Sequence, residues 1–432
     1  MYILLAIAFI IGYLFIAFEH PFKIDKAASA ILTGVICWVI LVLGQDTIFQ
    51  TVHESNFIDE SILHHLGEIA QILFFLLGAM TIVELIDTHG GFNIITSKIK
   101  TTNRIKLLWI IGVVTFFLSS VLDNLTTTIV MAALLKKLMH DKEDVWFFGG
   151  IVVVAANAGG AWSPIGDVTT IMLWIGGQVT AINIIKEVLL PSIVCLIVPL
   201  IILSCIKKGD VVRTSNVGNK INHNEIASPF EASLILWLGV AGLLFVPVFK
   251  NITHLPPFMG ILFSLGVLWV VTEIIHKNKL EDHRHRLSVA SVIRKVDTPS
   301  VLFFLGILLA VASLQTAGHL EQLAKVLNDS FGNIYIINII IGLISSIVDN
   351  VPLVAGAMGM YPLSLYPQDH EFWELLAFCA GTGGSALIIG SAAGVAIMGI
   401  LKIDFLWYLK KISWLALIGY FSGVLTFYLL NL

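Results

Sequence analysis

The chain has 432 residues, of which 57% are hydrophobic and only 12% are charged. This composition excludes a string of ordinary soluble domains and is typical of a polytopic membrane protein. The formal net charge of −4 is small and gives no reason to expect a nucleic-acid partner. The four cysteines lie in apolar segments without metal-like spacing, so we expect neither a disulfide framework nor a bound cofactor.

In the first half of the chain, apolar stretches long enough to cross a bilayer predict five membrane spans. These are 2–18, 28–44, 68–88, 147–176 and 182–206. The first lacks the basic start and the cleavage site of a signal peptide, so we interpret it as a retained span. The stretch 106–139 is long for one span and has polar residues at its centre. We therefore expect a re-entrant helical hairpin there, with its tip at Asp123-Asn124.

The second half of the chain repeats this pattern after a polar segment. Spans are predicted at 231–248, 258–276, 299–316, 372–402 and 405–430, with a second hairpin at 333–362 and its tip at Asp349-Asn350. The predicted organisation is a first repeat over 1–206, a cytoplasmic linker over 207–230, and a second repeat over 231–432.

Residue identities support the repeat. Leu73-Phe74-Phe75-Leu76 matches Leu302-Phe303-Phe304-Leu305, and Ala158-Gly159-Gly160 matches Thr382-Gly383-Gly384. Since each half has an odd number of spans, the second half must enter the membrane the opposite way up. The predicted fold is an all-α polytopic membrane protein with two inverted-topology repeats. Each repeat has five transmembrane helices and one re-entrant helical hairpin, with unwound helices at the midplane.

The positive charges are distributed unevenly in this topology. All Lys and Arg except Lys186, Lys250 and Lys325 fall in loops on one side. The positive-inside rule makes that side cytoplasmic and places both termini outside. His276, His283 and His285 lie in one of these basic loops, where we expect solvated side chains.

The two hairpin tips each place an acid within apolar sequence. No Lys or Arg lies close in sequence to Asp123 or Asp349. An unpaired carboxylate at membrane depth costs roughly 2.5–3.5 kcal/mol on insertion scales, so such acids suggest function. The alternative is that Asp and Asn at each tip only cap a helix.

A third polar segment interrupts the span at 147–176. Gly pairs and a Pro within the sequence from Asn157 to Asp167 loosen the helix and free backbone carbonyls. Asn157, Ser163 and Asp167 add hard oxygen ligands, which suit Na⁺ better than a soft metal. The second half offers Thr382 and Ser385, and its residue aligned with Asp167 is Ser391.

These motifs resemble NhaD-type sodium/proton antiporters of the ion transporter superfamily. The resemblance covers nearly the whole chain and is strongest at the two tips and the two interrupted spans. It implies a homodimer in which a moving part carries the hairpins against a scaffold. It also implies a bacterial inner-membrane transporter that exchanges Na⁺ or Li⁺ for H⁺ by alternating access. Cation and proton would compete for Asp123, Asp167 and Asp349, which we predict as the Na⁺ or Li⁺ ligands. Asn124, Asn157, Ser163, Asn350, Thr382 and Ser385 would complete the oxygen shell.

Two alternatives remain at this point. An anion transporter of the same superfamily, for dicarboxylate or arsenite, would need a cationic residue among the central polar groups, and the sequence near the motifs contains none. An intramembrane aspartyl protease could use Asp123 and Asp167 as its pair of acids. However, Pro164-Ile165-Gly166-Asp167 lacks the Gly-x-Gly-Asp pattern of such enzymes, and the repeat would be unexplained.

Overall fold

A computed structural model describes residues 1–17, 19–48, 57–96, 99, 101–139, 141–206, 209–211 and 227–432. These residues form 23 helices and no strand, with an isolated bridge between Asn103 and Asp210. Most of the predicted linker at 207–230 lies outside the described residues. Helix α12 begins at Pro229, so the last two residues of the predicted linker are helical.

The helices of the first half follow the predicted spans with local differences. They are α1 (Tyr2–Ala17), α2 (Glu19–Phe22), α3 (Lys26–Leu43), α4 (Gln45–Ile48), α5 (Phe57–Thr88), α6 (Gly91–Thr96), α7 (Arg104–Leu122), α8 (Asn124–Leu138), α9 (Lys142–Ala161), α10 (Val168–Ile175) and α11 (Ala181–Ile206). Helix α5 begins well before the predicted residue 68. Its first turns contain Asp59, Glu60, His64 and His65. These polar side chains lower the hydropathy of the segment, so it was not predicted as part of a span.

The second half contains the remaining helices. They are α12 (Pro229–Thr253), α13 (Pro257–His276), α14 (Glu281–Leu287), α15 (Val289–Ile293), α16 (Thr298–Thr316), α17 (His319–Phe331), α18 (Ile334–Ile344), α19 (Asn350–Met360), α20 (Glu371–Gly383), α21 (Ala392–Leu401), α22 (Phe405–Lys411) and α23 (Ser413–Leu430). Helix α17 was not predicted, because it is amphipathic and shorter than a span.

Side-chain caps define where several of these helices begin. Asp25 accepts a hydrogen bond from Ala27 N at 2.7 Å at the start of α3. Ser228 and Glu231 form a reciprocal capping box at the start of α12, with Pro229 as the first helical residue.

Within the described residues, nine helices are long and apolar enough to cross a membrane, or up to eleven if each of two bent pairs counts as one span. The predicted number of spans, ten, falls in this range, but the predicted span at 372–402 is not among the nine. Arg104–Leu122, assigned above to a re-entrant arm, is itself among the nine, while Tyr2–Ala17 is shorter than the others. Because a chain with this many spans cannot be soluble, it is an integral multi-pass membrane protein.

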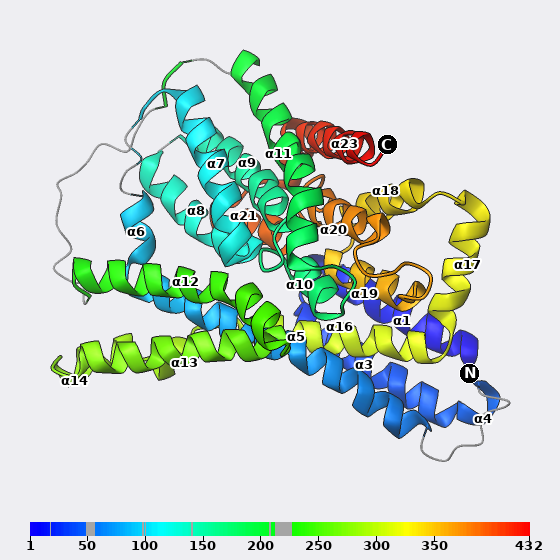
Figure 1. Cartoon of the computed structure of the whole chain (residues 1–432). Coiled ribbons are helices and arrows are strands. Elements are labelled where there is room, and N and C mark those ends of the chain that lie inside the picture. Colours follow the sequence, from blue (N-terminus) through cyan, green and yellow to red (C-terminus); the bar gives the residue numbers. More distant parts are fainter. Residues whose placement is uncertain are drawn as a thin grey trace.

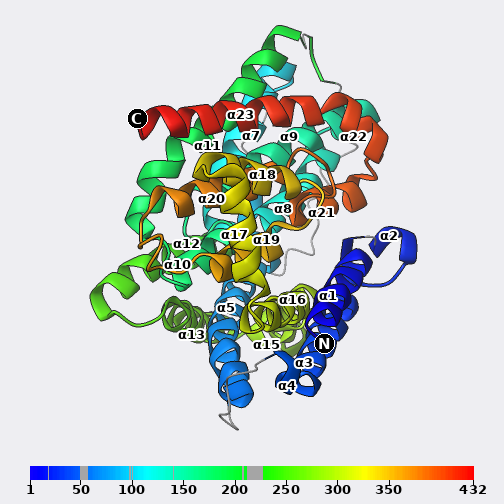
Figure 2. The same cartoon turned by 90° about the vertical axis from the view of Figure 1, so that its right-hand side faces the viewer.

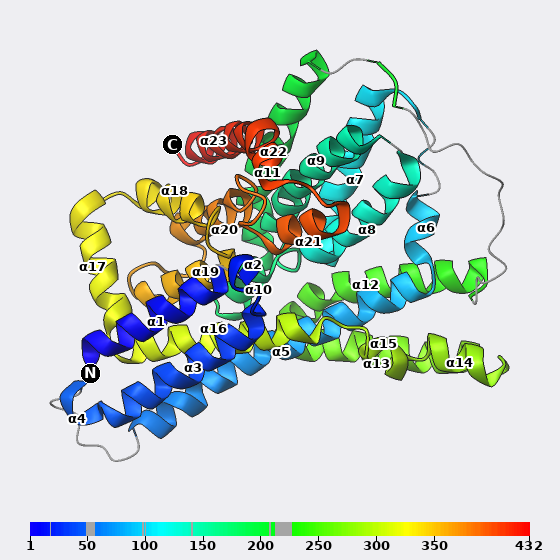
Figure 3. The same cartoon turned by 180° about the vertical axis from the view of Figure 1, so that it is seen from behind.

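The helices form two layers. The lower layer in Figure 1 contains α1, α3, α5, α12, α13 and α16, and the upper layer contains α7–α11 and α18–α23. Figure 2 shows α13, α5, α16 and α3 side by side beneath the upper layer, with α1 above α3. Figure 3 shows α8 and α21 next to each other in the upper layer, and these two helices are in contact.

Corresponding helices of the two halves make corresponding contacts. Helix α7 packs on α9 as α18 packs on α20, and α8 packs on α21 as α19 packs on α10. In the lower layer, α1 packs on α3 as α12 packs on α13, and α3 contacts α16 as α13 contacts α5. The two halves of the chain are therefore interleaved in both layers.

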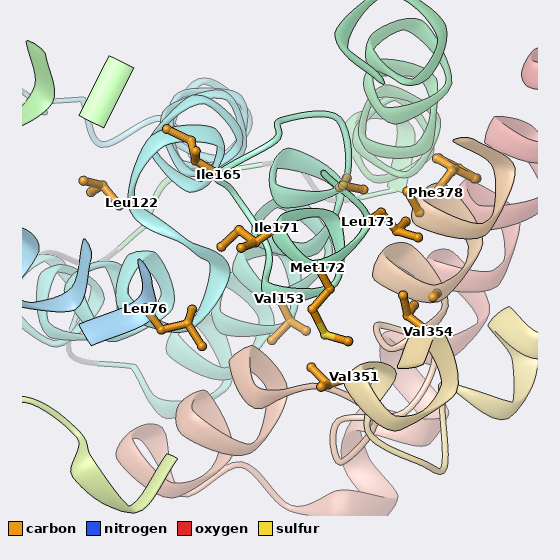
Figure 4. Packing of buried hydrophobic residues seen from close by; sticks show 14 of the residues in the cluster. Leu76, Leu122, Val153, Ile165, Ile171, Met172, Leu173, Val351, Val354 and Phe378 are labelled. Carbon is orange, nitrogen blue, oxygen red and sulfur yellow. The ribbon is translucent and has the colours of Figure 1, made fainter. Parts of the chain in front are cut away.

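Apolar side chains fill the space between these helices. Figure 4 shows Met172 of α10 beside Val351 of α19, with Val354 one turn further along the same helix. All three side chains are buried. This packing holds the short helices that follow the two interruptions against one another.

One predicted environment is wrong. His276 is the last residue of α13 and is only 2% exposed, rather than part of a solvated loop. Its ring stacks on that of His89 with centroids 5.1 Å apart and planes inclined by 10°. His283 and His285, in α14, are exposed as expected.

The contact between α3 and α16 is close enough to require glycine. A Cβ at Gly306 would collide with the backbone of Ala30 and Ile31, and one at Gly34 would lie 2.6 Å from the Gly306 carbonyl oxygen. Trp38 Nε1 also donates to the Leu309 carbonyl across the same contact, at 2.9 Å. Backbone-to-backbone packing of this kind is how small residues join membrane helices.

We predict that Gly306→Val separates α3 from α16 and lowers protein stability. Overpacking typically costs about 1–3 kcal/mol, so the thermal unfolding midpoint in detergent should fall by several degrees. Gly266→Ala is the matched control, since Gly266 is also helical but has no atom within 4 Å of an added Cβ. Equal midpoints for the two variants would contradict the close contact.

Candidate functional site

Each predicted hairpin tip is a break between two helices with an Asp-Asn pair at the break. Asp123 separates α7 from α8 and has a left-handed backbone, with φ of 75°. Asp349 precedes α19, after a non-helical stretch at 345–349. Asn124 and Asn350 are the first residues of α8 and α19, and both are buried.

The two predicted interruptions are also present. Helix α9 ends at Ala161 and α10 begins at Val168, while α20 ends at Gly383 and α21 begins at Ala392. A Cβ at Gly159 would collide with the Phe116 carbonyl of α7, and one at Gly383 would collide with the Gly342 carbonyl of α18. These glycines therefore let each interrupted helix cross directly over a hairpin arm.

Asp167 lies at the centre of the site and is only 1% exposed. Its Oδ1 accepts hydrogen bonds from Thr169 N at 2.9 Å and Thr169 Oγ1 at 2.8 Å, which caps α10. Its Oδ2 accepts from Asn124 Nδ2 of the first tip at 2.5 Å. Asn350 Nδ2 of the second tip lies 3.3 and 3.4 Å from the two oxygens. Both tips thus converge on one carboxylate.

Asn157 extends this network into the second half of the chain. Its Oδ1 accepts from Asn124 Nδ2 at 3.2 Å. Its Nδ2 donates to Ser385 Oγ at 3.0 Å and to Ser391 Oγ at 2.9 Å. The serine that aligns with Asp167 in sequence therefore takes part in the site, although it was not among the predicted ligands.

Asp123 has the capping role that the sequence left open. Its Oδ1 accepts from Thr126 N and its Oδ2 from Thr126 Oγ1, both at 2.8 Å. Asp349 is different, because no side-chain hydrogen bond caps α19. The two tips are thus similar in sequence but not in the contacts of their acids.

Asp349 has a basic neighbour in the structure, so the expectation of an unpaired acid at the second tip is wrong. Lys26 Nζ lies 3.6 Å from Asp349 Oδ2. Lys26 is more than three hundred positions away in the chain, so a search of the sequence around the motif could not identify it. Lys26 therefore adds a cationic side chain at the edge of the site rather than beside Asp167.

The other predicted ligands have separate partners. Ser163 Oγ donates to the Ser120 carbonyl at 2.5 Å, and Thr382 Oγ1 donates to the Phe378 carbonyl of its own helix at 2.6 Å. Asp123, Asp167 and Asp349 do not form a single cluster, because no group of three or more His, Cys, Asp or Glu side chains in the described part of the chain could hold one ion. Amide and hydroxyl oxygens must supply most of any oxygen shell.

Two cavities lie toward opposite ends of α5. One, of about 380 Å³, is lined by His65, Glu68, Gln71, Gln178 and Gln315. The other, of about 130 Å³, is lined by Glu84, Asp87, Thr126, Lys295 and Asp297. Glu68 and Glu84 are roughly 24 Å apart along the axis of α5, at about 1.5 Å of rise per residue. Asp167 lines neither of these two cavities.

Comparison with known proteins identifies the family. A family model described as citrate transporter matches residues 13–374. The chain belongs to this family. Sodium/proton antiporter 1 of Arabidopsis thaliana is 48% identical over 426 residues, which cover 97% of this chain and 71% of the plant protein. Sodium/proton antiporter 2 of the same plant is 45% identical over 423 residues, covering 98% of each chain.

A bacterial relative extends the match. The Na⁺/H⁺ antiporter NhaD of Vibrio cholerae is 29% identical over 452 residues, covering 98% of this chain and 90% of the relative. The predicted resemblance to NhaD-type antiporters is confirmed. A member of this citrate transporter family is a transporter and not an enzyme, so the protease alternative is excluded.

We predict that Asn157→Ala destabilises the protein by disrupting the network. The hydroxyl of Ser385 would lose its donor, and a buried group left unpaired costs about 1–3 kcal/mol. The Ser391 hydroxyl and the Asn124 amide would each lose one of two partners. Thermal unfolding in detergent measures the effect. Thr382→Ala is the control, because among the described residues its hydroxyl bonds to a carbonyl of its own helix and to no member of the network. An equal effect of both substitutions would show that the network adds little stability.

Proposed function

We propose that this membrane protein exchanges Na⁺ or Li⁺ for H⁺. The proposal rests on relatives named sodium/proton antiporters along the whole chain, combined with the surroundings of Asp167. Every hydrogen bond that Asp167 makes within the described residues comes from a neutral amide or hydroxyl group. A buried carboxylate held in this way needs a counter-ion, and a proton or a small hard cation can serve.

The cation and the proton compete for the same negative charge in this proposal. Asp167 is the central acid, and Asn124, Asn157 and Asn350 supply amide oxygens once their side chains reorient toward an ion. Asp123 and Asp349 lie within electrostatic range, since Asp167 interacts with each of them. Because a site with net negative charge holds either H⁺ or Na⁺, competition couples the two ions without a second device.

Alternating access would expose this site to each side in turn. The predicted inverted repeats are supported by the matching contacts of corresponding helices in the two halves. The cavity at His65 and Glu68 would face outside and the cavity at Glu84 and Asp87 would face the cytoplasm, as the distribution of Lys and Arg predicts. The upper layer, with both hairpins, would move against the lower layer. We further propose a homodimer in the bacterial inner membrane with both termini outside.

The decisive experiment measures proton movement in proteoliposomes that contain a pH-sensitive dye. Addition of Na⁺ or Li⁺ outside should move protons, and the response should disappear without protein. Citrate is added in a parallel experiment. If neither Na⁺ nor Li⁺ moves protons at any pH tested, the whole proposal is overturned.

A carboxylate anion is the second candidate substrate, and one observation favours it. Lys26 supplies the cationic residue that an anion site requires, and the family model is described as citrate transporter. However, Lys26 already faces Asp349, and the central carboxylate would repel an anion. Citrate uptake without any response to Na⁺ or Li⁺ would support this alternative.

We predict that Asp123→Asn, Asp167→Asn and Asp349→Asn each abolish cation-dependent proton flux. Asn caps a helix about as well as Asp, so the helices should persist while the charge is lost. Asp141→Asn is the control, since Asp141 caps α9 at the surface by accepting from Asp144 N at 2.9 Å. Near-normal flux in a tip variant that inserts and folds would assign that acid to capping alone.

We also predict that Na⁺ affinity weakens as pH falls. If Na⁺ displaces protons from the same carboxylates, its binding must release protons, and by linkage protons must oppose Na⁺. Calorimetry at several pH values, in buffers of different ionisation enthalpy, measures both quantities. Proton release near zero with affinity constant across pH would instead indicate separate sites for the two ions.

A further inference from the structure

Lys26 holds an unusual position for a basic residue in this chain. It is the first residue of α3, in the lower layer, and its ammonium lies 4.6 Å from the centre of the Phe303 ring of α16. Phe303 is the sixth residue of α16, so Lys26 is level with a point about 7 Å inside the end of that helix, at about 1.5 Å per residue. The charge therefore lies just inside the end of the helical layer, level with the second turn of α16.

The partner of Lys26 belongs to the other layer. Asp349 is at the tip between α18 and α19, which is in the upper layer. Tyr13 of α1 lies close enough to Asp349 to interact with it electrostatically. Three helices of the lower layer (α1, α3 and α16) thus surround the second tip, but only Lys26 contributes a charge.

The ion pair between Lys26 and Asp349 is loose enough for another cation to replace the ammonium. The 3.6 Å between Nζ and Oδ2 is longer than the roughly 2.8 Å of a charge-assisted hydrogen bond, so the pair attracts without a tight bond. The side chains are 25% and 16% exposed, so neither partner of the pair is fully buried. Asp349 makes no capping hydrogen bond that would hold it elsewhere.

We propose that Lys26 is a tethered cation that competes with the transported cation for Asp349. With the site empty of cargo, the ammonium neutralises Asp349 and attaches the second tip to the lower layer. When a Na⁺ ion binds at the tip, it replaces the ammonium, and the tip is released from α3. This inference rests on the proposed cation exchange and adds a residue that links binding to the movement between layers.

The arrangement has a clear thermodynamic consequence. A cation must displace Lys26 before it gains Asp349, so Lys26 lowers the observed Na⁺ affinity while it is present. Removing the ammonium should therefore tighten Na⁺ binding, whereas loss of a residue that merely supports the structure would weaken it. Tighter Na⁺ binding after removal of the ammonium thus indicates competition, and weaker binding indicates a structural role.

The test compares Na⁺ binding and transport in wild type, Lys26→Gln, Lys26→Arg and Lys142→Gln. Lys142 is the matched control, because its ammonium also lies over an aromatic ring, 4.5 Å from the centre of the Trp146 ring, and it is the first residue of α9 rather than part of a tip. Calorimetry on purified protein should show Na⁺ binding at least about fivefold tighter in Lys26→Gln, equivalent to about 1 kcal/mol. Proteoliposome flux in that variant should be slower, because tightly bound Na⁺ leaves slowly. Lys26→Arg should resemble wild type, and so should Lys142→Gln.

Each failure has its own meaning. Wild-type protein that moves protons with Na⁺, together with unchanged or weaker Na⁺ binding in Lys26→Gln, overturns the competition but leaves the proposed function intact. Wild-type protein that moves no protons with Na⁺ or Li⁺ overturns both. If Lys26→Gln unfolds, Lys26→Met replaces it, and Na⁺ binding in that variant that is no tighter than in wild type also overturns the competition.

Discussion

The structure depends on how one buried carboxylate is held by neutral groups. Asp167 receives hydrogen bonds from its own cap at Thr169 and from the amides of Asn124 and Asn350 at the two tips. Removing a carboxylate from water costs free energy, and hydrogen bonds from neutral dipoles offset only part of that cost. The two hairpins, the two interrupted helices and their close glycine crossings are the parts that bring these dipoles to one point. The same incomplete compensation leaves room for a cation or a proton.

The sequence predicted most of the helices and both halves of the site because these are local signals. Apolar runs of span length, the paired Asp-Asn motifs and the Gly-rich interruptions can all be identified without knowledge of distant contacts. The first part of α5 and the whole of α17 were not predicted, because spans were identified by continuous hydropathy. The first turns of α5 are polar, and α17 is amphipathic. Asn124, Asn157, Asp167, Asn350 and Ser385 then came together as one network, whereas Ser163 and Thr382 bonded to backbone carbonyls.

Lys26 shows why the remainder could not be predicted. The expectation of an unpaired acid at Asp349 was based on its sequence neighbours, but the nearest ammonium comes from the other half of the chain and from the other layer. Charge pairing across layers depends on the tertiary arrangement, which no local pattern specifies. The same reasoning applies to His276, which has basic neighbours in sequence but is stacked on His89 in the interior. Residues at helix ends are thus poorly classified by the loops that follow them.

The lengths of the helices in the lower layer differ in a way that concerns the lipid. Helix α5 has 32 residues and is about 48 Å long, whereas α16, which packs against it, has 19 residues and is about 28 Å long. A bilayer hydrocarbon core is about 30 Å thick, so α16 matches it while α5 must tilt or extend into water. The thickness of the surrounding membrane consequently becomes a variable that acts on this protein, independently of the ions it carries.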